Sequence, residues 1–306
     1  MYIFSTQQYS ELAKEVANKP NIDCQIGNIE VKHFADGEIY HRIKNPEELR
    51  DQDIVLIGGT INDTEIMNLY NLASCLVHCD IRKLHLVIPY FGYSTMERAI
   101  TYGEVIKAKN IARMFSGLPQ AINGNFIYLI DLHTEGIPFY FEGPSHVIHL
   151  YAKKEIHKMI KKIGTPSNMV LASTDAGRAK WVESLASDFG MQAAFVLKRR
   201  DENGTEVTAI NADVNGKTVV IYDDMIRSGG SIINAAKAYR AAGANKVYAT
   251  CTHGIFCSDG LEKLRTSNVI ERVFTTNTHA NCVQSNSGEF LTKISVSNLI
   301  AKGLRI

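Results

Sequence analysis

Residues 219–233 read Val-Val-Ile-Tyr-Asp-Asp-Met-Ile-Arg-Ser-Gly-Gly-Ser-Ile-Ile. A β-branched run ends in two adjacent carboxylates, Asp223 and Asp224, and a short Ser/Gly loop then opens a helical pattern. The backbone N–H groups of such a loop, together with a helix N-terminus, can hold a phosphate. Two ionised carboxylates are acceptors for the two hydroxyl donors of a ribose. The stretch therefore predicts a cradle for ribose 5-phosphate, while an ordinary strand–turn–helix with a serine cap and two solvated acids is the alternative.

Short apolar runs alternate with helical patterns along the rest of the chain. This alternation predicts an α/β fold in which helices flank parallel sheets. Such sheets bind ligands at the carboxyl ends of their strands. Strands are expected at 2–5, 29–34, 53–58, 84–90, 126–132, 169–174, 193–197, 206–211, 218–223, 246–252 and 271–276, and helices at 7–18, 63–79, 103–116, 151–163, 178–189, 231–242 and 291–302.

The passages 53–93 and 218–256 echo each other in the order strand, polar loop, helix, strand. A duplicated domain explains this echo, and chance similarity between two βαβ units is the alternative. The turn-rich residues 161–168 favour a seam around 145–165. We expect an N-terminal domain over 1–148 and a C-terminal domain over 149–306.

The composition excludes several classes of protein. The 306 residues are 45% apolar and 21% charged, with a net charge of +1. This length suits two α/β domains, and the near-neutral charge argues against a general binder of nucleic acid or of membrane surfaces. No signal peptide and no apolar run long enough to cross a bilayer are seen. Six scattered cysteines without a Cys-x-x-Cys pair favour reduced thiols. We therefore expect a soluble, cytoplasmic protein.

Polar residues follow two further expected strands. His133, in the segment Asp131-Leu132-His133, could reach a hydrated magnesium–triphosphate unit, because magnesium keeps several waters and takes few protein ligands. A capped turn with a hydrogen-bonded histidine fits the same residues. Asp175 could meet a metal or a sugar, or could cap the helix that follows it.

Charged and aromatic residues mark three other candidate sites. The cations of Lys198-Arg199-Arg200 could neutralise a reacting polyphosphate, although a solvated basic strand end is the usual alternative. Residues 34–38, Phe-Ala-Asp-Gly-Glu, offer an aromatic face and two carboxylates to a purine base, or form a β-turn at Asp-Gly. Glu97 and Arg98 could contact a nucleotide or pair with each other. Neither a Walker motif nor a Gly-x-Gly-x-x-Gly motif after a strand is present.

Taken together and in this order, these segments resemble the ribose-phosphate diphosphokinases, also called phosphoribosyl-pyrophosphate synthetases. The resemblance extends over nearly the whole chain. It rests on Phe-Ala-Asp-Gly-Glu (34–38), Val-Ile-Pro-Tyr-Phe-Gly-Tyr (87–93), Asp-Leu-His (131–133), Asp-Ala-Gly (175–177), Lys-Arg-Arg (198–200), Asp-Asp-Met-Ile-Arg-Ser-Gly-Gly-Ser (223–231), Thr-His-Gly-Ile-Phe (252–256) and Ile-Ser-Val-Ser-Asn-Leu-Ile (294–300).

The resemblance implies two related phosphoribosyltransferase-type, Rossmann-like domains with mainly parallel sheets. The first is the ATP side and the second the ribose-phosphate side, and the last helix packs back on the first. It also implies that ATP donates its β,γ-diphosphate to the anomeric hydroxyl of ribose 5-phosphate and leaves as AMP. The implied partners are ATP, a 5-phosphorylated ribose and Mg2+, with no nucleic acid and no membrane, in a homo-oligomer whose ATP sites span subunit interfaces.

The resemblance assigns roles residue by residue. Lys198 and Arg200 are the implied catalytic residues, and His133 and Asp175 the magnesium-associated pair. The implied ATP-binding residues are Phe34, Asp36, Glu38, Thr95, Glu97, Arg98 and His133. The implied ribose-phosphate-binding residues are Asp175, Asp223, Asp224, Arg227, Ser228, Gly229, Gly230 and Ser231.

Two departures from the commonest family pattern leave alternatives open. The Thr-x-Glu-Arg pattern at 95–98 resembles the divergent plant-type branch. Arg227 stands where most members have Asp, and an extra cation favours a more negative acceptor, such as ADP-ribose. The guanidinium could instead point to solvent or pair with an acid. A catalytically silent regulatory paralogue and a phosphoribosyltransferase that consumes the diphosphate are the competing functions.

Overall fold

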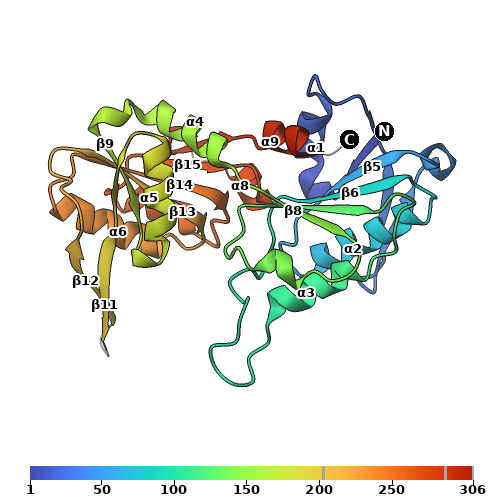
Figure 1. Ribbon diagram of the computed structural model, residues 1–306, viewed down its shortest axis with the longest axis horizontal. Coiled ribbons are helices and arrows are strands. Elements are labelled where there is room, and N and C mark those ends of the chain that lie inside the picture. The colour runs from blue at the N-terminus through green and yellow to red at the C-terminus, as the bar shows by residue number, and fades with distance from the viewer. Residues whose placement is uncertain (202–203, 286–287, 305–306) are drawn as a thin grey trace. The chain divides into compact units, whose positions relative to one another are not determined.

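The computed structural model describes residues 1–201, 204–285 and 288–304, and for 198–201 and 204–208 it describes the backbone alone. The chain forms two compact units, each built around one six-stranded sheet (Figure 1). The first unit comprises Met1–Tyr151 and Val296–Ile306, and the second comprises Ala152–Ser295.

The first sheet is parallel throughout, in the order β2 (Gln25–Ile26), β1 (Tyr2–Ser5), β5 (Asp53–Ile57), β6 (Lys83–Ile88), β7 (Asn125–Ile130) and β8 (His146–Leu150). Its helices are α1 (Ser10–Ala17), α2 (Asp63–Val77), α3 (Lys107–Ser116) and α9 (Ser297–Gly303), with 3-10 turns η1 (Gln7–Tyr9), η2 (Pro46–Leu49) and η3 (Ile137–Tyr140). The last helix, α9, contacts α1 and β8.

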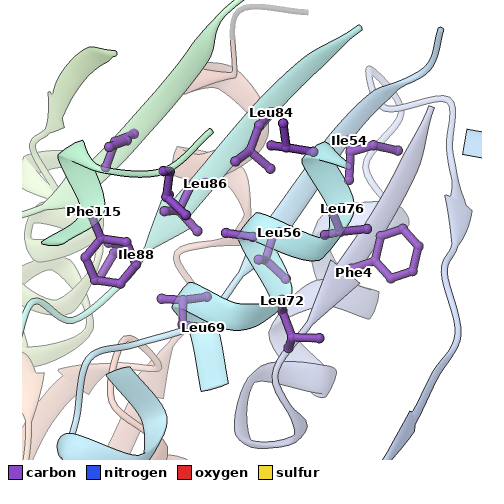
Figure 2. Close-up of a cluster of buried hydrophobic side chains, with 14 of the residues drawn as sticks. Phe4, Ile54, Leu56, Leu69, Leu72, Leu76, Leu84, Leu86, Ile88 and Phe115 are labelled. Atoms are coloured by element: carbon purple, nitrogen blue, oxygen red, sulfur yellow. The ribbon is translucent and has the colours of Figure 1, made fainter. Parts of the chain in front are cut away.

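The core of the first unit lies between α2 and the sheet (Figure 2). Leu69, Leu72 and Leu76 follow helical spacing along one side of α2 and are buried among strand residues that include Leu56 and Leu84. All five residues of β5 are buried, as is typical of a central parallel strand that is covered on both faces. Its near-continuous apolar run is therefore the reason that the sequence predicts this strand.

The second sheet is also parallel, in the order β10 (Gln192–Ala194), β9 (Met169–Ser173), β13 (Thr218–Ile226), β14 (Lys246–Gly254), β15 (Val273–Thr276) and β16 (Leu291–Ile294). Its helices are α4 (Lys153–Ile163), α5 (Ala179–Asp188), α6 (Gly230–Ala241), α7 (Gly260–Thr266) and α8 (Ala280–Gln284), with 3-10 turns η4 (Pro166–Asn168), η5 (Ala176–Arg178) and η6 (Gly288–Phe290).

The two units share one topology. Each has an antiparallel hairpin inserted before its central strand: β3 (Ile29–His33) with β4 (Ile39–Ile43) in the first unit, and β11 (Val196–Asp201) with β12 (Gly204–Ile210) in the second. In each unit the first strand leads through a 3-10 turn into a helix. Because β5 starts its pairing at Asp53↔Lys83 and β13 at Thr218↔Lys246, Gly58 and Gly59 correspond to Asp223 and Asp224. The shared order favours duplication over chance similarity.

Several expected elements differ from those observed. Residues 291–302 are not one helix: Leu291–Ile294 form strand β16 and only Ser297–Gly303 are helical. The three-residue spacing of Leu291 and Ile294 fits a helix, but Leu291 and its neighbours pair with β15. The strands β4 and β8 and the short helices α7 and α8 were not expected, and α3 begins at Lys107 rather than at residue 103. Within the described part of the chain, no helix has the length and apolar character needed to span a membrane.

Candidate active site

The carboxylates of Asp223 and Asp224 lie inside β13, beyond the end of the neighbouring strand β9. The pairing of β9 with β13 stops at Tyr222↔Ser173, whereas β13 stays paired with β14 as far as Ile226↔Gly254. On the β9 side, the Thr174 hydroxyl donates a hydrogen bond to Asp223 Oδ2 at 3.3 Å. The two acids therefore stand at the carboxyl edge of the sheet, where open parallel sheets bind ligands.

Arg178 pairs with both carboxylates. Its Nη2 lies 2.7 Å from Asp224 Oδ2 and its Nε lies 3.4 Å from Asp223 Oδ1. Arg178 is the last residue of η5, which Asp175 caps by accepting a hydrogen bond from the Gly177 N–H at 2.9 Å. The sequence analysis missed Arg178. The available signal was a cation that closely follows the strand-end acid Asp175.

The environment of the pair alters its protonation. Burial and the adjacent Asp224 charge raise the pKa of Asp223 above that of an ordinary aspartate, while Arg178 acts in the opposite direction. Cys251 lies opposite Asp223 in the backbone pairing of β13 with the neighbouring strand β14, and burial raises the pKa of the Cys251 thiol. A nearby cation offsets part of the cost of holding two carboxylates at this partly buried edge.

The loop after β13 leaves its amides open. Gly229, the cap position of α6, has φ +80°, and a Cβ there would lie 2.8 Å from Leu264 Cγ, so both strain and space favour glycine. No side chain caps α6, and among the described residues no hydrogen bond uses the N–H groups of Ser228, Gly229, Gly230 or Ser231. These groups, at the N-terminus of a 12-residue helix, are donors for an anion.

The corresponding helix of the first unit, α2, is closed to an anion. The Asn62 side chain caps it by accepting a hydrogen bond from the Glu65 N–H at 2.9 Å, and Asp63 and Glu65 lie in its first turn. The first turn of α6 carries no acid. Since carboxylates already occupy the positive end of α2, an anion at this position is disfavoured in the first unit and not in the second.

The candidate base-binding residues 34–38 form the turn between β3 and β4. The Phe34 N–H donates to the Glu38 carbonyl at 2.9 Å, and the Glu38 N–H donates to Asp36 Oδ1 at 3.1 Å. Gly37 has φ +94°, so the β-turn at Asp-Gly that the sequence analysis gave as the alternative is present. Phe34 is 51% exposed, and its ring meets that of Tyr40 edge-on with 6.5 Å between centroids. The Phe34 side chain is therefore accessible to a base.

Thr95, Glu97 and Arg98 lie in the loop between β6 and α3. Arg98 Nε lies 3.5 Å from Glu97 Oε1, so the two side chains pair with each other. The Tyr140 hydroxyl donates to the Glu97 carbonyl at 2.7 Å and holds this part of the loop. Contact of these residues with a nucleotide stays a prediction.

His133 follows β7 in a loop that begins with Asp131 at φ +38°. The Asp131 N–H donates to the Leu150 carbonyl at 3.1 Å, and the Leu132 N–H donates to His149 Nε2 at 3.0 Å. Burial lowers the pKa of His149, which favours the neutral ring that this hydrogen bond requires. This hydrogen bond holds the backbone directly before His133 in place. The sequence analysis did not single out His149.

The structure thus groups part of the expected site. Asp175, Asp223, Asp224 and residues 227–231 belong to the second unit. Lys198 and Arg200 lie on β11, with backbone pairings Lys198↔Val207 and Arg200↔Thr205, and their side chains lie outside the described residues. The other candidates belong to the first unit. The described residues contain no group of three or more His, Cys, Asp or Glu arranged for a metal.

Comparison with known proteins places the chain in a family. Residues 1–118 match the N-terminal domain of ribose phosphate pyrophosphokinase, and residues 176–306 match the phosphoribosyl synthetase-associated domain. The chain is 32% identical to the ribose-phosphate pyrophosphokinase of Thermotoga maritima, over 99% of this chain and 94% of that protein. It is also 32% identical to the chloroplastic ribose-phosphate pyrophosphokinase 1 of Arabidopsis thaliana, over 98% of this chain and 73% of the relative.

A solved structure agrees. The phosphoribosylpyrophosphate synthetase of Mycobacterium smegmatis superposes with a TM-score of 0.84 at 26% identity, covering 98% of this chain and 96% of that one. The predicted α/β fold of phosphoribosyltransferase type is therefore confirmed. Equal identities to bacterial and chloroplastic relatives leave the plant-type branch a prediction. The chain belongs to the ribose-phosphate pyrophosphokinase family.

Proposed function

We propose that this chain transfers the β,γ-diphosphate of ATP to the anomeric hydroxyl of ribose 5-phosphate, which gives phosphoribosyl pyrophosphate and AMP. The observation that carries the proposal is the difference between the two units. Only the second combines two carboxylates at the sheet edge with an uncapped helix N-terminus free of acids. This combination matches a sugar diol linked to a phosphate.

The acceptor is held by the second unit. Asp223 and Asp224 accept hydrogen bonds from the ribose hydroxyls, and the amides of Ser228–Ser231 receive the 5-phosphate. Arg227, exposed at the start of this loop, adds a positive charge. That charge is also the reason to test ADP-ribose as an acceptor.

The donor is held by residues of the first unit. The exposed Phe34 side chain stacks on the purine, with Asp36 and Glu38 beside it. Thr95, Glu97, Arg98 and His133 complete the proposed ATP-binding set. In the reaction the anomeric hydroxyl loses its proton, its oxygen bonds to the β-phosphorus, and the bond from that phosphorus to AMP breaks. Such transfers require positioning and neutralisation of charge, the proposed task of Lys198 and Arg200.

The donor set fits Mg2+ in part. Magnesium prefers oxygen ligands and is usually bound by one or two carboxylates plus substrate phosphates, so a single carboxylate such as Asp175 suits it. One oxygen of Asp175 accepts the Gly177 N–H, which fixes the orientation of the carboxylate. An imidazole is a less typical ligand, and His133 suits a phosphate or a metal-bound water. When bound, the ion neutralises the charge of the phosphates.

The test is a product analysis of the purified chain with ATP, Mg2+ and either ribose 5-phosphate or ADP-ribose. We expect AMP and phosphoribosyl pyrophosphate in equal amounts from ribose 5-phosphate. Absence of AMP with every acceptor contradicts the proposal and supports a silent regulatory paralogue. Release of pyrophosphate from phosphoribosyl pyrophosphate and a base would instead identify a phosphoribosyltransferase.

Three further points belong to this proposal. We assign the first unit to the ATP side and the second unit, Ala152–Ser295, to the ribose-phosphate side, where the sequence analysis expected domains over 1–148 and 149–306. We also propose a homo-oligomer, which sedimentation can test. The cytoplasmic location stays a prediction.

A further inference from the structure

The two units carry different residues at one corresponding position. Tyr9 is the last residue of η1, and Arg178 is the last residue of η5. Each turn follows the first strand of its unit and leads directly into a helix, α1 or α5. Tyr9 and Arg178 therefore occupy equivalent places at the carboxyl edge of the two sheets.

The partners of these residues differ with them. In the first unit, a Cβ on Gly59 would lie 2.1 Å from the Tyr9 hydroxyl oxygen, so Tyr9 fills the space of a missing side chain. In the second unit, the equivalent of Gly59 is Asp224, and Arg178 lies 2.7 Å from its Oδ2. A tyrosine thus accompanies a glycine in one unit, and an arginine accompanies a carboxylate in the other.

The geometry of Arg178 suits a support for two acceptors. Its guanidinium is planar and stays charged at any working pH, and it uses Nε toward Asp223 and Nη2 toward Asp224. The Thr174 hydroxyl and the Asp224 N–H also donate to Asp223. Each carboxylate has about four acceptor sites, so both keep capacity for a ligand.

We propose that Arg178 is the positioning residue of the sugar site: its guanidinium holds Asp223 and Asp224 side by side as acceptors for the adjacent hydroxyls of a 5-phosphorylated pentose. This inference rests on the proposed function for the identity of the sugar. It adds that a pentose lacking one of these hydroxyls, such as 2-deoxyribose 5-phosphate, is rejected through the arrangement that Arg178 maintains.

The test compares Arg178→Gln and Arg178→Lys with Lys180→Gln. Lys180 is exposed on α5 and provides a neighbouring charge deletion outside the site. In Arg178→Gln we expect the KM for ribose 5-phosphate to rise about 10- to 100-fold, the range for a charge-assisted hydrogen bond, with kcat and the KM for ATP within about threefold. Arg178→Lys restores part of the loss, and Lys180→Gln matches the wild type.

The pH profile separates this role from a merely structural one. The charged and titratable groups that face Asp223 among the described residues are Asp224, Arg178 and Cys251. Because the Arg178 charge lowers the pKa of Asp223, its removal should shift the acidic limb of ribose 5-phosphate binding to higher pH. A profile identical to that of the wild type contradicts the inference.

Two other results would overturn it. The first is an unchanged KM for ribose 5-phosphate in both Arg178 variants. The second is a fall in kcat without a change in KM, which would place Arg178 at the transferred diphosphate rather than at the sugar.

If the wild type forms no AMP, the proposed function fails, but Arg178 can still be tested by calorimetry, which compares the affinities of the protein for ribose 5-phosphate and 2-deoxyribose 5-phosphate. If Arg178→Gln still prefers ribose 5-phosphate to the deoxy sugar, the role of Arg178 is refuted. If the variant binds the two sugars equally, the role is supported. Arg178→Lys serves if the glutamine variant does not fold.

Discussion

A charge placed in the first turn of α6 should block the proposed phosphate site while it stabilises the helix. Ser231 is the second residue of this helix and is exposed, so it accepts a new side chain without repacking the core. Ser231→Asp and Ser231→Asn give side chains of the same shape that differ in charge. The aspartate places a carboxylate in the first turn of α6, as Asp63 and Glu65 do in the first turn of α2.

The expected magnitude follows from electrostatics. Two unit charges about 4 Å apart repel by about 1 kcal/mol in bulk water and by about 4 kcal/mol at an effective dielectric of 20. Because Ser231 is exposed, we expect a repulsion between the new carboxylate and the 5-phosphate of about 1.5 to 3 kcal/mol, between these two limits. This corresponds to about a 10- to 100-fold increase in the KM for ribose 5-phosphate. The same carboxylate at a helix N-terminus raises the free energy of unfolding by about 0.3 to 1 kcal/mol.

The assay is steady-state kinetics of both variants at low and high salt, together with urea unfolding. We expect the KM for ribose 5-phosphate to be higher in the aspartate variant than in the asparagine variant, with the ratio shrinking as salt screens the repulsion. The KM for ATP should be equal in the two. Equal KM values for ribose 5-phosphate would refute the placement of the 5-phosphate at this helix end.

Further predictions concern catalysis, pH and packing. Lys198→Ala should abolish turnover and leave the thermal unfolding midpoint unchanged; a near-normal rate would remove Lys198 from the mechanism. Burial, with a contribution from the charge of His253, lowers the pKa of His279 to about 4. Burying neutral His279 therefore contributes stability that is fully present above its unfolded pKa of about 6.5. As the pH falls to about 4, up to about 3 kcal/mol of unfolding free energy is lost. Urea unfolding should show a smaller loss over this pH range in His279→Gln. Gly59→Ala should cost about 1 to 3 kcal/mol of unfolding free energy, because its Cβ would lie 2.1 Å from the Tyr9 hydroxyl, whereas Gly136→Ala, whose Cβ would meet only Thr134 Cγ2 at 3.8 Å, should be nearly neutral.

The sequence predicts the central strands better than the edges. The residues of β5 and most of those of β13 are buried, and this burial leaves near-continuous apolar runs that are visible in the sequence. None of the residues of the edge strand β8 is fully buried, so its sequence, His-Val-Ile-His-Leu, needs no continuous apolar run. Without such a run, the sequence gives no strand signal at this position. The strand β16 has only four residues. Such segments become strands because a neighbour is available to pair with them, and that neighbour lies elsewhere in the sequence.

The site is limited in the same way, because contacts between segments distant in the sequence are not visible in the sequence. Asp223 and Asp224 could be predicted because two carboxylates interrupt an apolar run, and the loop after them because its Ser/Gly composition is distinctive. For Arg178 the sequence offers only a weak signal, a cation three residues after Asp175, because its partners lie on a different strand and come together only through the pairing of β9 with β13. His149 is a similar case, because its contact with the Leu132 N–H depends on β7 and β8 being neighbours.

Duplication also explains how the two units can take different roles without a change of fold. The sheets keep one strand order, and the differences concentrate at the carboxyl ends, where Gly59 and a capped α2 stand against Asp224 and an open α6. The acids in the first turn of α2 would repel a ribose phosphate placed in the first unit as we propose for the second. The first unit must therefore contribute through other segments, and its hairpin β3–β4 carries the candidate base-binding turn. The equivalent hairpin β11–β12 carries Lys198 and Arg200, so one insertion point in the fold supplies both the proposed nucleotide contact and the proposed catalytic cations.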